Sequence, residues 1–124
     1  MEKKIQISDS EWQIMKVIWA NSPIAANDII ETLGDSVDWA PKTIKTLINR
    51  LVSKEVLGYT KEGRTYLYYP LITSKETIAQ ENRSFLSKVH NGSFASLVAS
   101  FVDEDEFTDK ELEELKKLLD SKTK

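Results

Sequence analysis

DWAPKTIKTLINRLVSKEVLGYTKEGRTYLYYP, residues 38–70, is the stretch that decides the fold. Its first half predicts a helix over residues 41–54, because Pro41 suits the first helical position, where a backbone N–H would have no partner. Apolar side chains then recur at intervals of three and four residues, which is the spacing of one buried helical stripe. This stripe consists of Ile44, Leu47, Ile48, Leu51 and Val52.

The other face of this predicted helix carries hydroxyl, amide and basic side chains. No acidic residue lies between Lys42 and Lys54, although plain surface helices usually mix in Asp or Glu. Lys binds guanine or phosphate, Asn binds adenine, and Thr offers a hydroxyl or contacts a thymine methyl. The face therefore favours DNA contact, and a solvated surface helix is the alternative. The candidate DNA-binding residues on it are Lys42, Thr43, Lys45, Thr46, Asn49 and Arg50.

The second half of the stretch predicts a β-hairpin, or wing, over residues 57–70. Two runs rich in aromatic and β-branched residues flank Glu62-Gly63, which we expect to form a two-residue turn because glycine readily adopts positive φ. Lys61 and Arg64 are further DNA-binding candidates, since they would flank the tip and reach a phosphate backbone or the minor groove. A helix followed by such a hairpin is typical of a winged helix-turn-helix, in which the helix reads the DNA.

The segment before residue 38 completes this pattern. Ser8 and Glu11 form a capping box that predicts the start of a first helix. A short second helix is predicted over residues 27–33, and Ile24-Ala25 before it is a candidate third strand beside the hairpin. The apolar face of the first helix is expected to comprise Trp12, Met15, Val17 or Ile18, and Trp19. We therefore expect a mainly α fold with a small β-wing, and place the winged-helix domain in residues 1–72.

Residues 73–124 predict a second domain of three helices. A piece this small buries a stable core with difficulty, yet burying each of its large apolar side chains is worth about 1.5–3 kcal/mol. We expect a second copy to cover them in a two-fold homodimer; folding back onto the winged helix is the alternative. Such a dimer would read a pseudo-palindromic operator with half-sites about 34–36 Å apart. The expected dimer interface comprises Phe94, Leu97, Val98, Phe101, Leu112, Leu115 and Leu119.

Charge is distributed unevenly along the chain, whose net charge is −3. Residues 39–72 carry six basic and two acidic side chains, a local charge of +4, whereas residues 103–114 carry eight acidic side chains and one basic. Attraction to a polyanion depends on the field within a Debye length of about 10 Å rather than on the sum over the chain. The pattern therefore favours double-stranded DNA as the partner of residues 39–72.

Composition argues against several other classes of function. The chain has no cysteine and one histidine, which leaves no thiolate metal site, histidine cluster or histidine-dependent triad to assemble. We therefore expect no enzyme activity, no metal and no cofactor. No apolar run approaches the roughly 18 residues of a membrane span, and the polar start is unlike a signal peptide. We accordingly expect a cytoplasmic protein without membrane insertion.

Four segments that sample nearly the whole chain in order carry a family resemblance: ISDSEWQIMKVIW (7–19), DWAPKTIKTLINRL (38–51), GRTYLYYP (63–70) and FASLVASFV (94–102). Together they resemble the penicillinase-repressor family of the BlaI/MecI type, to which copper-responsive CopY-type repressors are related. The resemblance implies a homodimeric repressor that covers a bacterial promoter until an inducing signal arrives. It also implies that the face of Lys42, Thr43, Lys45 and Thr46 enters the major groove.

The resemblance leaves the inducing signal open. Antibiotic-responsive members are inactivated by cleavage of an Asn-Phe bond in the penultimate helix, which a membrane sensor protease triggers. The matching bond here joins Ser100 to Phe101, so Ser stands in place of Asn. Copper-responsive members carry a cysteine cluster near the C-terminus, and this chain has no cysteine. Proteolysis between Ser100 and Phe101 and an unrelated signal remain the alternatives for induction. A protein-interaction module without sequence-specific DNA binding is the alternative function.

Overall fold

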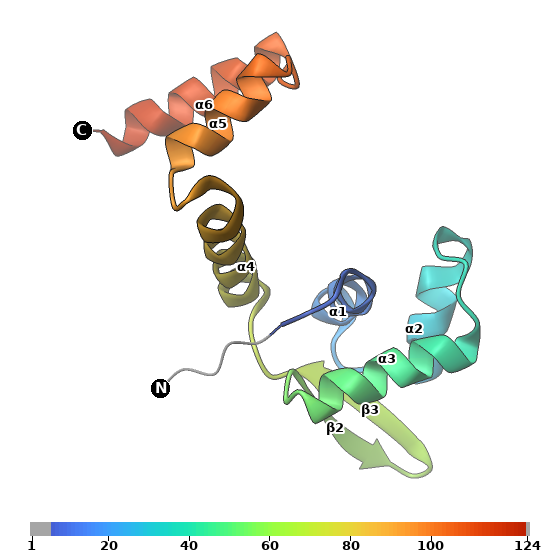
Figure 1. Ribbon diagram of the computed structural model, residues 1–124. Helices are drawn as coiled ribbons and strands as arrows, with labels where there is room; N and C mark the ends of the chain where they lie inside the picture. The colour runs from blue at the N-terminus through green and yellow to red at the C-terminus, as the bar shows by residue number, and fades with distance from the viewer. Residues whose placement is uncertain (1–5, 124) are drawn as a thin grey trace. The chain divides into compact units, whose positions relative to one another are not determined.

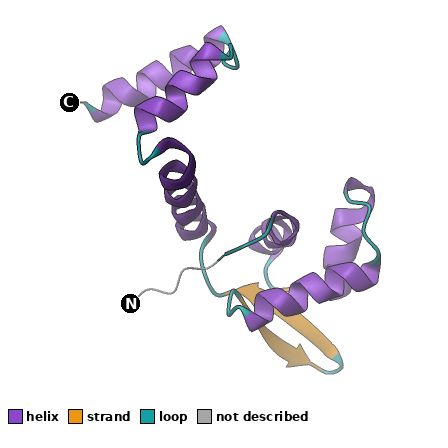
Figure 2. Ribbon diagram, in the orientation of Figure 1, coloured by secondary structure: helices purple, strands orange, loops and turns teal. Residues whose placement is uncertain are grey.

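The computed structural model describes residues 6–123, and the chain divides into two compact units between Thr77 and Ile78. Helices dominate, and a small antiparallel sheet is the one β element among the described residues (Figures 1 and 2). This confirms the predicted fold class, mainly α with a small β-wing. The elements of the first unit are α1 (Asp9–Asn21), β1 (Ile24–Ala25), α2 (Ala26–Leu33), a 3-10 turn (Gly34–Ser36), α3 (Pro41–Ser53), β2 (Leu57–Glu62) and β3 (Thr65–Pro70). Those that follow are α4 (Ser74–His90), α5 (Phe94–Asp103) and α6 (Asp109–Lys122).

Helix α1 begins at the predicted capping box. The Glu11 N–H donates to Ser8 Oγ at 3.2 Å, and the Ser8 N–H donates to Glu11 Oε1 at 2.8 Å. The side chain of each residue thereby accepts from the backbone N–H of the other, which fixes where the helix starts. Helix α3 starts at Pro41 as predicted and ends at Ser53, one residue before the expected end, with Lys54 as its C-cap.

The core of the first unit lies between α1, α2, α3 and the start of β2. Its fully buried side chains include Ile14 and Ile18 of α1, Ile29 of α2, and Ile48 and Leu51 of α3. The predicted face of α1 packs against this core, but the prediction omitted Ile14. The indoles of Trp12 and Trp19 are only partly buried and pack on the margin of the core. The margin suits an indole, because the ring is large and its polar N–H needs a hydrogen-bond partner. Trp19 Nε1 donates to the Ile72 carbonyl at 3.0 Å.

The sheet has the order β1-β3-β2, with antiparallel pairing throughout. The candidate third strand is confirmed, because Ile24 pairs with Tyr68. The predicted turn was wrong by one residue: Glu62 pairs with Thr65, so the two loop residues are Gly63 and Arg64. Gly63 has a φ of 64°, and a glycine at the first loop position is the pattern of a type II′ hairpin turn. Pairing up to Glu62 places Arg64 in the turn itself.

The second unit, from Ile78 onward, has no buried side chain among residues 78–123. Its helices are nevertheless well delimited: Asn91 and Gly92 have φ of 50° and 81° between α4 and α5, and Thr108 with Glu111 forms a capping box at the start of α6. The unit therefore has defined helices without an enclosed core. No helix within residues 6–123 is both long enough and apolar enough to cross a lipid bilayer.

Candidate nucleic-acid interface

Helix α3 separates its two faces as the sequence predicted. Ile44, Leu47, Ile48 and Leu51 are buried, and Val52 is half-buried. The six candidate side chains on α3 are all exposed. Thr46 Oγ1 donates to the Lys42 carbonyl at 3.0 Å, one turn back along the helix. The helix thus offers a solvent-facing surface of hydroxyl, amide and basic groups, on a backbone that the core holds in place.

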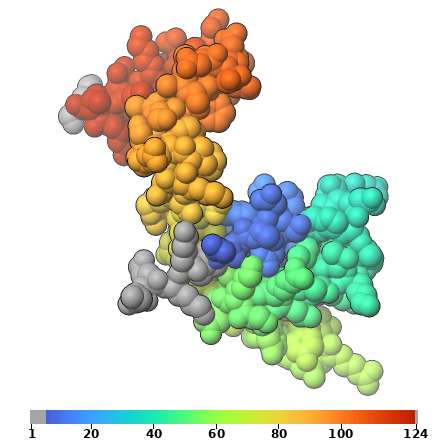
Figure 3. All heavy atoms as spheres, in the orientation of Figure 1, coloured from blue at the N-terminus to red at the C-terminus, as the bar shows by residue number. Residues whose placement is uncertain are grey.

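The wing projects from the first unit beside α3 (Figure 3, yellow-green). An open hollow of about 310 Å³ lies between the wing and α3, and its lining brings together Lys45 and Asn49 of α3 with Arg64 of the turn. Asn27 of α2 lines the same hollow. Three of the predicted residues, from two separate elements, therefore surround one recess. The remaining predicted residues on α3 line neither this hollow nor its neighbour; they are Lys42, Thr43, Thr46 and Arg50.

Tyrosines of the wing are the residues that sequence reasoning missed. A second open hollow, of about 330 Å³, is lined by Tyr59, Tyr66 and Tyr68 together with Asn49, Val52 and Ser53 of α3. Burial raises the pKa of the Tyr68 hydroxyl, and the nearby Tyr66 and Tyr59 raise it further. The Tyr68 phenol therefore stays a neutral hydrogen-bond donor at physiological pH. The missed signal was the alternation of tyrosines along the strands, which places them on one face.

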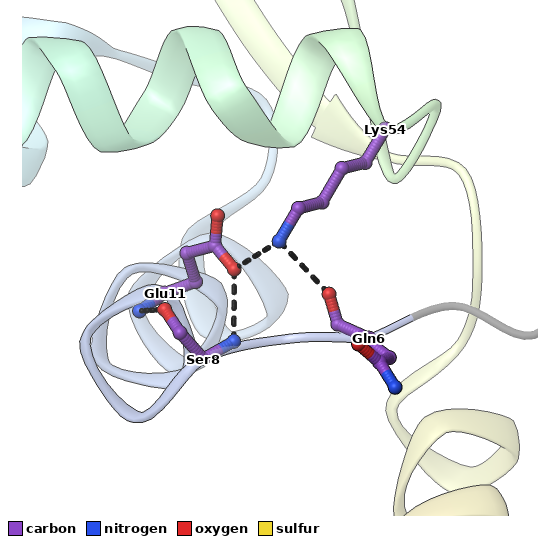
Figure 4. A network of polar contacts seen from close by, with 4 residues as sticks. All are labelled: Gln6, Ser8, Glu11 and Lys54. Carbon is purple, nitrogen blue, oxygen red and sulfur yellow. Dashed lines mark hydrogen bonds and ion pairs between the residues drawn. The ribbon is translucent and has the colours of Figure 1, made fainter.

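Lys54 has a different role from the other basic residues of this region (Figure 4). Its Nζ lies 2.6 Å from Glu11 Oε1 and donates to the Gln6 carbonyl at 2.9 Å. The Glu11 side chain is only 2% exposed, and the Lys54 side chain is 38% exposed. Lys54 is one of the six basic side chains behind the local charge of +4 in residues 39–72. Its ammonium, however, is neutralised by this ion pair. The positive charge that this region offers to solvent is therefore smaller than the sequence count suggested.

The protonation of Glu11 reflects two opposing effects. Burial raises the pKa of this carboxyl, while the hydrogen bond and charge of Lys54 and the hydrogen bonds from Ser8 lower it. The net pKa lies below the ordinary value of a glutamate. Glu11 is thus ionised at neutral pH, and the ion pair joins the start of α1 to the residue that follows α3.

The predicted dimer-interface residues lie on α5 and α6. Leu97, Val98 and Leu115 are half-buried, and the other four are exposed. Phe94 is 51% exposed and Phe101 is 44% exposed. The bond between Ser100 and Phe101 lies inside α5, where Ser100 Oγ donates to the Leu97 carbonyl at 2.9 Å. The isolated chain therefore leaves much of this apolar surface in water.

A recognition-type helix, an adjacent basic hairpin and a supporting helical core define a winged helix-turn-helix protein. The penicillinase repressor family model matches residues 7–121. The chain therefore belongs to the penicillinase repressor family, as the sequence resemblance implied.

Individual relatives agree with this assignment over nearly the whole chain. The penicillinase repressor of Bacillus licheniformis is 40% identical over 120 residues, which cover 97% of this chain and 94% of that protein. The methicillin resistance regulatory protein MecI of Staphylococcus aureus strain N315 is 38% identical over 120 residues, covering 97% and 98%. The match therefore includes the helical second unit as well as the winged helix.

One of the similar solved structures is a complex with operator DNA. It is the solution structure of Bacillus licheniformis BlaI in its monomeric form with the blaP half-operator. Its sequence is 45% identical to the aligned part of this chain, and the TM-score is 0.53. The alignment covers 61% of this chain and 93% of that chain. The part of this chain that the alignment covers is thus similar to a protein whose structure was determined in complex with a half-operator.

Proposed function

We propose that this protein is a homodimeric transcriptional repressor that binds a pseudo-palindromic DNA operator. The observation that carries the proposal is the exposed polar and basic face of α3 beside the wing, in a chain of the penicillinase repressor family. The half-operator complex of the BlaI relative supports DNA as the ligand of this surface. Because a bacterial operator lies in the cytoplasm, we place the protein there.

We propose a division of roles among the DNA-facing side chains. Helix α3 enters the major groove, where base edges distinguish all four base pairs. Basic residues at and beside the wing neutralise phosphates, which supplies affinity without sequence information. The proposed contacts on α3 are Lys42, Thr43, Lys45, Thr46, Asn49 and Arg50, and those on the wing are Lys61 and Arg64.

We propose that residues 73–124 form the dimerisation domain and residues 1–72 the DNA-binding domain. The support is that none of residues 78–123 is buried, although the segment is rich in large apolar side chains. Phe85 is 46% exposed and Leu118 is 65% exposed. A second copy would cover such surfaces and place two winged helices on one operator.

We propose that induction acts by disrupting this dimer. Cleavage between Ser100 and Phe101 would divide α5 and separate its two halves of the interface, so operator affinity would fall to that of one half-site. A protease pathway coupled to a membrane sensor would serve this purpose. A ligand or another signal is the alternative, because Ser occupies the position where the antibiotic-responsive relatives carry Asn.

The proposal is tested with the DNA upstream of the protein's own gene. We expect a mobility shift with that duplex at about 0.1–0.15 M salt, and much weaker binding to a random duplex of equal length. Equal affinity for both duplexes would favour the protein-interaction module instead. Lys16→Ala is a matched control for variants on α3, since Lys16 is exposed on α1 and its loss removes one positive charge elsewhere.

A further inference from the structure

One face of the wing is a continuous surface of tyrosine rings. Tyr59 stands opposite Tyr68 in the strand register, and Lys61 stands opposite Tyr66. The ring centroids of Tyr59 and Tyr66 are 5.3 Å apart in an edge-on arrangement, and the Lys61 Nζ lies 5.7 Å from the Tyr66 centroid. Tyr59 is 51% exposed and Tyr66 is 44% exposed. Large aromatic side chains are thus held in place by one another while half of their surface meets solvent.

This tyrosine face forms one wall of a groove whose other wall is α3. The two hollows described above share Asn49, Tyr66 and Tyr68, so they are adjoining parts of this groove. Lys45 and Arg64 lie at one part, and Ser53 and Tyr59 at the other. The groove therefore begins beside the base-reading face of α3 and continues along the wing.

The chemistry of the lining suits a strand of sugar and phosphate. No acidic side chain lines either hollow, although the chain contains 20 acidic residues. Hydroxyl, amide and basic groups are the usual donors to phosphate oxygens. Aromatic ring faces offer apolar area against which deoxyribose can pack.

We propose that the groove between α3 and the tyrosine face of the wing holds one backbone strand of the duplex, with Tyr59 and Tyr66 as sequence-independent contacts. The inference rests on the proposed DNA-binding function and adds contacts to it. It places the flat side of the wing, and not only its basic tip, against the nucleic acid. Uncharged donors in this groove contribute affinity without releasing counterions.

The test uses full-length protein with Tyr59→Phe and Tyr66→Phe variants. Each variant keeps the ring and removes one hydroxyl donor, so we expect affinity to fall about three- to tenfold. The loss is expected to be equal for the upstream duplex and for a random duplex. The slope of log K against log salt is expected to stay unchanged, whereas Arg64→Ala should reduce its magnitude by about 1, the value for one phosphate.

Tyr69→Phe is the matched control. Tyr69 stands opposite Gly58 on the other face of the wing and lines neither hollow, so removing its hydroxyl should leave DNA affinity unchanged. Unchanged affinity in both groove variants, or a loss confined to the upstream duplex, would overturn the backbone assignment. If wild-type protein does not distinguish the two duplexes while the groove variants still bind both more weakly, the repressor proposal fails and the groove assignment stands.

Discussion

Replacing Lys54 by Met tests how much the ion pair between Lys54, at the end of α3, and Glu11 of α1 stabilises the winged helix. The substitution keeps an unbranched side chain of similar length but removes the ammonium that lies 2.6 Å from Glu11 Oε1. A carboxylate that is 2% exposed then loses its counter-ion. Removing one partner of a buried ion pair costs about 3–5 kcal/mol. Since the Lys54 side chain is 38% exposed, solvent screens part of this interaction, and we expect about 2–3 kcal/mol.

The assay is thermal unfolding followed by circular dichroism. At about 4–8 °C per kcal/mol for a small domain, the Lys54→Met variant should melt about 10–20 °C below wild type at pH 7. Glu11→Gln should reduce the free energy of unfolding less than Lys54→Met does. The glutamine carbonyl can still accept from the Ser8 N–H, as in a capping box, and the Lys54 ammonium can extend into water. A larger loss for Glu11→Gln than for Lys54→Met would refute the assignment of the buried carboxylate as the costly group.

The pH dependence separates charge from packing. In wild type the pKa of Glu11 is lowered, so its contribution is complete above the ordinary pKa of 4.5 and is lost as pH falls through the lower folded value. In Lys54→Met, the hydrogen bond and charge of Lys54 are lost while burial and the Ser8 hydrogen bonds remain, so the pKa of Glu11 rises above its wild-type value and the penalty shrinks as falling pH protonates the carboxyl. The difference in melting temperature between the two proteins should therefore shrink from pH 7 to 4.5. A difference that stays constant with pH would mean that lost packing, not charge, causes the destabilisation.

Three other predictions concern the proposed repressor. Lys45→Ala and Thr46→Ala should each weaken operator binding about tenfold with an unchanged melting temperature; a drop in melting temperature would show that their face is buried. Leu97→Asp and Phe101→Asp should give monomers in sedimentation velocity, and a persistent dimer would remove α5 from the interface. Induced cells should contain a fragment that ends at Ser100, detected by mass spectrometry, whereas full-length protein alone after induction would point to another signal.

The sequence by itself determined the individual elements of this protein and the exposed face of α3. Capping boxes at Ser8 and Thr108 and the apolar stripe of α3 are local patterns, because helix hydrogen bonds and side-chain periodicity span only a few residues. The four resembling segments also identified the family, which the family model confirms over residues 7–121.

Tertiary structure decided the features that depend on residues far apart in the chain. The turn at Gly63-Arg64 follows from how β2 and β3 pair, and one residue of register cannot be read from composition. The partner of Lys54 is Glu11, 43 positions away, so counting charges along the sequence assigned that ammonium to the DNA-facing surface. The groove of tyrosines arises only when the hairpin packs beside α3. Short-range periodicity carries no information on such long-range pairings, because they are selected by the packing of the whole unit.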